Sequence, residues 1–311
     1  MRVCYLIQSH KNPEQIYRLV NTIKKTSPES IIIVSHDFSS SQLDEKQLNH
    51  LPEVYLVSGL GGRGNFSIIE GYLNAIDWLF KNKIEFDWLT NLSGQDYPTQ
   101  HLSEINNFLS NTYYEGFLEY FKVFSTESHW SLREGYTRYL YKYHKIKFIA
   151  QLPDRVKDWL APIKIINYVQ PFLRINIAFG MIGLKRKPIF KENLVCYGGS
   201  FFCTLSKKCI EYLYNFSKSN RNIIDYYQEV NVPEESFLQT VLINSHLFKL
   251  CNDNKFYIDF TGTRNGRPRL LSTEDYASIV KSDTYFARKF DLDKDRQILD
   301  LLDNRILSVN S

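Results

Sequence analysis

The sequence predicts an α/β fold in which a parallel sheet is covered by helices on both faces. Over the first ~110 residues, short apolar runs alternate with longer segments that have helical periodicity, which is typical of βαβ order. The apolar runs are rich in β-branched residues and nearly continuous, as expected of strands that are buried on both faces. With 311 residues, 43% of them hydrophobic, the chain can bury such a sheet in one compact domain.

The expected elements follow in order along the chain. In the first part we expect strands at 2–8, 30–35, 54–57 and 86–92, helices at 13–25, 67–80 and 102–109, and a glycine-rich turn at 59–64. In the later part we expect a glycine turn, a short strand and a helix within 197–214, a helix over 233–245, and a polar C-terminal helix after 283–291. Proline favours the first position of a helix, so the helix over 233–245 is expected to start at Pro233. No repeat or linker is evident, so residues 1–311 are expected to form a single domain.

Composition restricts the class of function. The net charge of +4 is too small to predict nucleic-acid binding. Five cysteines, an odd number without a CxxC pair, indicate a reducing compartment without a disulfide framework. The N-terminus enters a strand directly and lacks the apolar region of a signal peptide, and no apolar stretch reaches the ~18 residues of a membrane span. Attachment to a membrane surface through the apolar and basic segment 165–187 remains open beside the commoner solvated face.

Polar residues are expected to meet at the carboxyl edge of the sheet, where such folds bind ligands. They are Ser9 and His10, His36 and Asp37, Gly61 to Gly64, and Ser93 to Asp96. Asp37 could accept hydrogen bonds from a nucleotide base or ribose, or it could cap a turn. Backbone NH groups of the glycine-rich segment 59–65 could approach a phosphate, although this segment fits neither GxGxxG nor a Walker loop and a tight turn is the alternative.

Charged residues suggest chemistry that does not use a metal. A DxD motif binds a divalent metal ion through two aspartates that are two residues apart. Here Asp96 follows a strand, but the residue two positions before it is Gly94, so the second carboxylate is missing. Cationic side chains would then have to neutralise a leaving diphosphate. Arg288 and Lys289, which stand between aromatic residues, suit that task, unless they are an exposed pair at a helix end. Glu235 could act as a general base at a helix N-terminus, where the helix dipole alone would also favour an acidic residue.

Taken together, these segments resemble the core-2/I-branching N-acetylglucosaminyltransferases and peptide O-xylosyltransferases, which form glycosyltransferase family 14. The resemblance covers most of the chain and is weakest over 119–190. The segments that carry it are, in order, Tyr5-Leu6-Ile7-Gln8-Ser9-His10-Lys11-Asn12, Ile33-Val34-Ser35-His36-Asp37, Phe66-Ser67-Ile68-Ile69-Glu70, Asn91-Leu92-Ser93-Gly94-Gln95-Asp96-Tyr97-Pro98, Gly198-Gly199-Ser200-Phe201-Phe202, Pro233-Glu234-Glu235-Ser236-Phe237 through Ser245, and Phe286-Ala287-Arg288-Lys289-Phe290.

The resemblance implies a GT-A type, Rossmann-like nucleotide-binding sheet and an inverting transfer from a UDP-sugar, with GlcNAc or xylose as the sugar and without a bound metal. Residues 1–115 would be the UDP-sugar-binding half, and residues 116–311 the acceptor-binding and catalytic half. By position in the family's segments, Glu235 looks like the catalytic base. Arg288 and Lys289 look like the diphosphate clamp, and Asp37 looks like the contact to the uridine end. Ser9, His10, Gly94 and Asp96 complete the expected nucleotide site.

The acceptor side is less defined by the sequence. The candidates to bind a glycan acceptor lie in a polar and aromatic segment and are Glu119, Trp130, Glu134 and Arg138. The resemblance implies an acceptor of surface polysaccharide biosynthesis, lipid-linked glycans included. Xylosyltransferase-like members carry an acidic residue after Gly-Gly-Ser, where this chain has Phe201, and this difference argues against an acceptor site of their kind. The expected protein is a bacterial-type member, cytoplasmic or peripheral on the inner face of the membrane. Two alternatives are a non-catalytic module that binds UDP-sugar or glycan, and a scaffold at the membrane surface.

Overall fold

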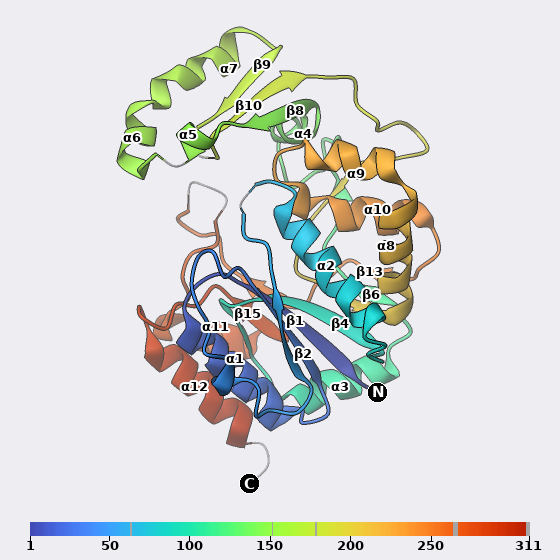
Figure 1. Cartoon of the computed structure of the whole chain (residues 1–311), viewed down its shortest axis with the longest axis vertical. Coiled ribbons are helices and arrows are strands. Elements are labelled where there is room, and N and C mark those ends of the chain that lie inside the picture. The colour runs from blue at the N-terminus through green and yellow to red at the C-terminus, as the bar shows by residue number, and fades with distance from the viewer. Residues whose placement is uncertain (63, 151, 178, 264–266, 309–311) are drawn as a thin grey trace.

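The computed structural model describes residues 1–62, 64–150, 152–177, 179–263 and 267–308. Figure 1 shows a main body, in which a sheet lies between two layers of helices, and an outer lobe at one end. The strands are β1 Val3–Ser9, β2 Ile31–His36, β3 Val54–Ser58, β4 Trp88–Ser93, β5 Asp96–Pro98, β6 Gly116–Phe117, β7 Phe121–Lys122, β8 Tyr141–Lys145, β9 Leu173–Asn176, β10 Met181–Lys185, β11 Tyr197–Gly198, β12 Thr204–Ser206, β13 Leu250–Cys251, β14 Phe256–Ile258 and β15 Phe286–Arg288.

The helices cover both faces of the sheet and also form part of the outer lobe. The α-helices are α1 Pro13–Thr26, α2 Ser67–Lys81, α3 Leu102–Asn111, α4 Leu132–Tyr139, α5 Lys147–Ala150, α6 Asp154–Trp159, α7 Ile166–Val169, α8 Lys207–Ser219, α9 Arg221–Gln228, α10 Phe237–Ser245, α11 Tyr276–Lys281 and α12 Arg296–Leu307. Short 3₁₀ turns are η1 Glu45–Gln47, η2 Ala161–Ile165, η3 Pro233–Glu235 and η4 Thr273–Asp275.

The central sheet is mixed but mostly parallel. Its order is β13-β6-β12-β4-β1-β2-β3, and the neighbours β4, β1, β2 and β3 are parallel to one another. These four strands confirm the α/β prediction, because they match the four expected strands within two residues at each end. The wholly parallel sheet that we expected is wrong, since β12 pairs antiparallel with both β4 and β6.

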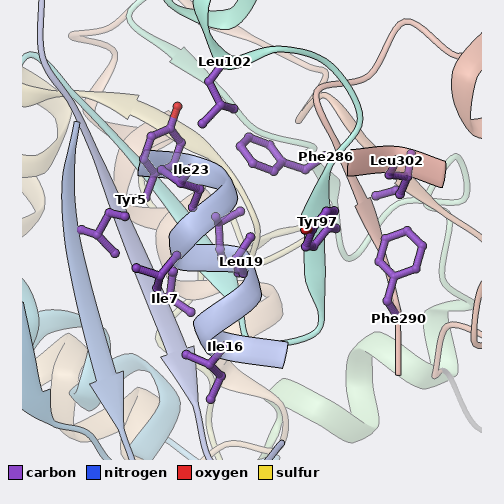
Figure 2. Close-up of a cluster of buried hydrophobic side chains, with 14 of the residues drawn as sticks. Tyr5, Ile7, Ile16, Leu19, Ile23, Tyr97, Leu102, Phe286, Phe290 and Leu302 are labelled. Atoms are coloured by element: carbon purple, nitrogen blue, oxygen red, sulfur yellow. The ribbon is translucent and has the colours of Figure 1, made fainter. Parts of the chain in front are cut away.

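The two faces of the sheet bury two separate hydrophobic clusters. Alternation along β1 sends Tyr5 and Ile7 into one cluster and Cys4 and Leu6 into the other. Figure 2 shows the first cluster, in which one face of α1 packs against β1. The helices α3, α11 and α12 contribute to this cluster as well, and α2, α8, α9 and α10 contribute to the second. Each fully buried aliphatic side chain stabilises the fold by about 1.5–3 kcal/mol. The two clusters together therefore hold the strands, and with them the edge of the sheet, in a fixed position.

A second small sheet, β14-β15-β5, lies outside the main one and positions charged residues. In the antiparallel register of β15 and β5, Arg288 lies opposite Asp96. Arg288 therefore belongs to a strand, and the alternative of a basic pair at a helix end is wrong. The single helix expected over 233–245 is also wrong. The 3₁₀ turn η3 comes first, Ser236 departs from helical geometry at φ −148°, and α10 begins at Phe237.

The outer lobe comprises residues 141–187. Its strands form the three-stranded sheet β8-β10-β9, and α5, α6, η2 and α7 lie in the connection between β8 and β9. Figure 1 shows these elements together at the end of the molecule farthest from α12. Among the described residues, no helix is both long enough and apolar enough to span a membrane.

Candidate active site

The carboxyl ends of β1, β2 and β4 bring the expected polar residues together. Ser9 Oγ and His36 Nδ1 are 2.8 Å apart, and the Asp37 amide donates to the Ser9 carbonyl at 2.9 Å. The Gly94 amide donates to the carbonyl of Gln8 at 3.1 Å. Ser9 and His36 are buried, and Gly94 packs on Ser9 and Ile16. Ser9 and Gly94 therefore shape the edge of the sheet, and the expected contact between Ser9 and a nucleotide stays a prediction.

Asp37 lies at this edge and orders the loop that follows β2. Its Oδ1 accepts hydrogen bonds from the Ser39 amide at 3.0 Å and from the Ser39 hydroxyl at 2.6 Å, and these donors lower the pKa of Asp37. The glycine-rich loop passes so close that a Cβ on Gly61 would stand 1.8 Å from Asp37 Oδ2. The predicted glycine-rich turn thus packs against this carboxylate, while its residue Arg63 lies outside the described residues.

Asp96 is a buried counterion. It has no exposed surface and accepts hydrogen bonds from the Ser93 amide and hydroxyl at 2.7 and 2.8 Å. Its Oδ1 lies 3.2 Å from Arg288 Nε, and the Arg288 guanidinium stacks 3.6 Å from the Phe202 ring centroid. Burial raises the pKa of Asp96. In the described structure the Asp96 carboxylate therefore holds Arg288, and the expected direct contact between Asp96 and a nucleotide stays a prediction.

Four cationic side chains gather at the end of β15, namely Arg288, Lys289, Lys11 and Arg267. Burial, together with the positive charges of Lys11, Arg288 and Arg267, lowers the pKa of Lys289. No carboxylate among the described residues lies within ion-pair distance of the Lys289 ammonium. Such a concentration of positive charge is favourable when an anion binds. We had not predicted Lys11 or Arg267, although Lys11 directly follows the residues that end β1.

His10 connects the Asp37 side of the sheet edge with this cation group. The His10 side chain is exposed, and it lies near enough for Asp37, Lys11 and Lys289 to act on its charge. Partial shielding of its ring from water by the surrounding chain and the Lys11 charge lower the pKa of His10, and the Asp37 charge partly opposes this. His10 is therefore close to both the Asp37 side and the cation side of this edge.

Glu235 is held in place by an arginine from a distant helix. Arg138 Nη1 donates to Glu235 Oε2, and Arg138 Nη2 donates to Glu134 Oε1 at 2.5 Å. The same guanidinium lies 4.1 Å from the Trp130 ring centroid. Burial disfavours the charge of Arg138, but the two carboxylates more than compensate and raise its pKa. Within the described residues Glu235 Oε1 accepts no hydrogen bond, and the side chain is 34% exposed. One carboxylate oxygen is thus fixed and the other is free.

Glu234 lies beside this pair in a different environment. Its Oε2 is buried without a hydrogen-bond partner. Burial and the neighbouring Glu235 charge raise the pKa of Glu234 to about 8, although Arg138 and the Gly64 amide oppose this. Gly64 also accepts a hydrogen bond from Val232 at 3.1 Å through its carbonyl. The glycine-rich loop therefore contacts Asp37 at one end and the glutamate pair at the other.

The fourth expected acceptor residue lies on the other side of Glu235. Glu119 Oε2 accepts from the Ser200 amide at 3.1 Å, and the Gly199 amide donates to the Glu235 carbonyl at 3.0 Å. The glycines there are required by close approach, since a Cβ on Gly199 would stand 1.9 Å from the Glu119 carbonyl oxygen. Phe201, which follows Ser200 in the chain, is buried in the second hydrophobic cluster and takes no part in the site.

The two halves of the site lie within electrostatic reach of each other, because the Glu235 carboxylate acts on the charge of Arg288. The structure thus brings a free carboxylate oxygen, a group of cations and an aromatic, charged surface into one region. No group of three or more His, Cys, Asp or Glu side chains in the described part of the chain could hold a metal ion. Such an arrangement can bind an anion and take a proton from a neighbouring hydroxyl.

Comparison with known proteins identifies the class. The profile of the family described as "Branch: Core-2/I-Branching enzyme" matches residues 3–280. The chain therefore belongs to the Core-2/I-Branching enzyme family, a family of glycosyltransferases that use nucleotide-sugar donors.

Curated relatives are distant. Beta-glucuronosyltransferase GlcAT14A of Arabidopsis thaliana is 21% identical over 255 residues, which cover 78% of this chain and 47% of the relative. Xylosyltransferase 2 of Homo sapiens is 25% identical over 261 residues, covering 77% of this chain and 26% of the relative. Xylosyltransferase oxt of Drosophila pseudoobscura pseudoobscura is 22% identical over 323 residues, covering 94% of this chain and 32% of the relative. The chain spans less than half the length of each of these proteins.

Proposed function

We propose that the protein transfers one sugar from a UDP-sugar to a glycan hydroxyl, with inversion at the anomeric carbon and without a metal ion. The observation that supports this proposal is that Arg138 fixes one oxygen of Glu235 and leaves the other free, while the Glu235 charge acts on Arg288, the neighbour of Lys289. A module that only binds UDP-sugar would need the cations but not the carboxylate. A GT-A type arrangement of the sheet is part of the proposal and rests on family membership.

In the proposed reaction the acceptor hydroxyl lies against Glu235 Oε1. Glu235 takes the proton while the acceptor oxygen attacks the anomeric carbon from the face opposite UDP. The new bond from oxygen to carbon forms as the bond to the β-phosphate oxygen breaks, and the electron pair leaves with UDP. Arg138 fixes Glu235 Oε2, so that only one carboxylate oxygen faces the acceptor. A single displacement with one base gives inversion.

The cations take the place that a metal ion has in other transferases. Arg288 can grip two phosphate oxygens, and Lys289 acts as a point charge. Because Lys289 is held among other cations, binding of a diphosphate relieves repulsion that the free protein must tolerate. Asp96 already accepts hydrogen bonds from Ser93 and pairs with Arg288. In this proposal Asp37 binds the uridine end of the UDP-sugar, and His10 lies near both Asp37 and the cations.

The donor and acceptor are narrower proposals. GlcNAc and xylose follow from the sequence resemblance, and the name of the Arabidopsis relatives adds glucuronic acid to the sugars that need testing. On the acceptor side, Trp130 offers an aromatic face, and Glu134 and Glu119 offer carboxylates for sugar hydroxyls. A surface glycan on a lipid carrier, built on the cytoplasmic side of a membrane in a bacterial-type cell, is the acceptor that we propose.

The test is release of UDP from a panel of UDP-GlcNAc, UDP-xylose and UDP-glucuronic acid, with EDTA present throughout. Release from one donor that persists in EDTA supports the metal-free transferase and identifies its sugar. Tight binding of UDP without turnover of any donor, even with oligosaccharide acceptors added, would favour the non-catalytic module.

A further inference from the structure

The outer lobe has an unusually apolar exterior. Nine of the 17 large hydrophobic side chains that are exposed in the described chain lie within residues 148–184. The most exposed are Phe148 at 75%, Trp159 at 79%, Ile165 at 68%, Tyr168 at 71%, Val169 at 73% and Phe172 at 70%. Scattered apolar residues are ordinary on a surface, but this concentration in one small lobe marks an interaction site.

The lobe is too small to bury these side chains itself. Its own cluster of buried side chains in the described structure consists of Tyr141, Tyr143 and Met181, packed against Leu140 and Phe179. Internal contacts instead fix the shape of the lobe. Tyr141 OH donates to the Pro171 carbonyl at 2.6 Å, and the Asn167 side chain bonds the backbone of Ile175 at 2.8 and 2.9 Å. The apolar exterior is therefore held on an ordered support.

Charge in the chain is segregated into the same lobe. Residues 141–187 contain ten Lys and Arg against two Asp, a net charge of +8, whereas the whole chain carries +4 and the remainder therefore −4. Lys145, Lys164 and Lys185 are exposed in the same lobe, and none of them has an ion pair within the described residues. Aromatic residues interleaved with lysines are typical of surfaces that lie in the interface of an anionic bilayer.

The lobe is connected directly to the proposed active site. Helix α4, which carries Glu134 and Arg138, continues into β8, and Arg133 on the same helix stacks 4.0 Å from the Tyr168 ring centroid. A Cβ on Gly64 would stand 2.9 Å from the Phe179 ring, so the glycine-rich loop also touches the lobe. A surface on which the lobe rests would thus lie next to the acceptor side of the site.

We propose that the outer lobe is a docking surface for an anionic lipid bilayer, with its aromatic and aliphatic side chains in the interface and its lysines against the head groups. A second copy of the chain is a poorer occupant of the same face, because a symmetric contact would bring together two lobes that are both rich in positive charge, even though Glu229 pairs with Lys142 and Arg186. The docking does not depend on the proposed reaction and can be tested without it.

The experiment uses the full chain and vesicles of phosphatidylcholine with or without about 30 mol% of the anionic lipid phosphatidylglycerol. The protein is expected to sediment with anionic vesicles, to sediment little with neutral ones, and to dissociate at high salt. Trp159 is the most exposed of the four tryptophans, so lipids brominated on their acyl chains should quench its fluorescence. Sedimentation that is equal with neutral and anionic vesicles, or absent from both, would overturn the proposal.

Two variants with the same change in charge separate the lobe from general electrostatics. Charge reversal at Lys145, Lys164 and Lys185 to Glu should weaken binding by about 100-fold or more, since each basic residue near an anionic surface contributes about fivefold. Reversal at Lys25, Lys46 and Lys281, which are exposed on the main body, should weaken it far less. An equal loss of vesicle binding in both variants would contradict the assignment. A concentration-dependent dimer of the wild-type protein, abolished by Trp159→Ser and Phe172→Ser, would contradict it as well.

Discussion

The buried carboxyl of Glu234 makes a definite prediction about the pH dependence of stability. Its pKa in the folded protein is about 8, compared with 4.5 for an ordinary glutamate. Between these two values the folded state holds a proton that the unfolded state has released. The free energy of unfolding must therefore fall as pH rises through this window, by up to about 1.4 kcal/mol per pH unit from this one group.

Glu234→Gln removes this dependence because the amide is neutral at every pH. The variant should resemble the wild type near pH 4.5 and become progressively more stable than the wild type towards pH 8. Urea unfolding of both proteins at several pH values measures the difference directly, since other titrating groups contribute equally to both curves. Parallel curves from pH 4.5 to 8 would show that Glu234 is solvated or paired, and would refute the argument from its unpartnered Oε2.

Two further changes test the supports of the site. Asp96→Asn should lower the free energy of unfolding by about 3 kcal/mol, because it leaves Arg288 buried without its counterion. Binding of UDP should restore more stability to this variant than it adds to the wild type. A variant that is as stable as the wild type in the absence of UDP would contradict the buried pair. Gly64→Ala should cost about 1–2 kcal/mol, since Gly64 has φ +67° and its Cβ would displace Phe179, and a thermal melt unchanged from wild type would contradict this.

The sequence predicted the local parts of the fold well, because their signals are local. The β-branched run at 31–36 and the one-sided apolar pattern of 13–26 each define an element without reference to the rest of the chain. The antiparallel position of β12 between β4 and β6 depends on pairing across more than 80 residues, which no local pattern contains. The break at Ser236 was missed for a related reason: its hydroxyl is held by Tyr227 and Thr240 in the core.

Prediction of the site was similarly divided. The order of the polar segments at strand ends was enough to place Ser9, His36 and Asp37 together. The pairing of Arg138 with Glu235 joins residues 97 positions apart, and only the i,i+4 spacing of Glu134 and Arg138 hinted at a charged cluster.

The most direct test of the central proposal compares Glu235→Gln with Glu229→Gln in the UDP-release assay with EDTA. Glu229 is a suitable control because it is also paired with an arginine, Arg186, and its 33% exposure is close to the 34% of Glu235. The account predicts that Glu235→Gln lowers turnover by about 10²–10⁴-fold while UDP binding is retained, and that Glu229→Gln stays near wild type. Turnover by Glu235→Gln at the wild-type rate would contradict the assignment of Glu235 as the base that receives the acceptor proton.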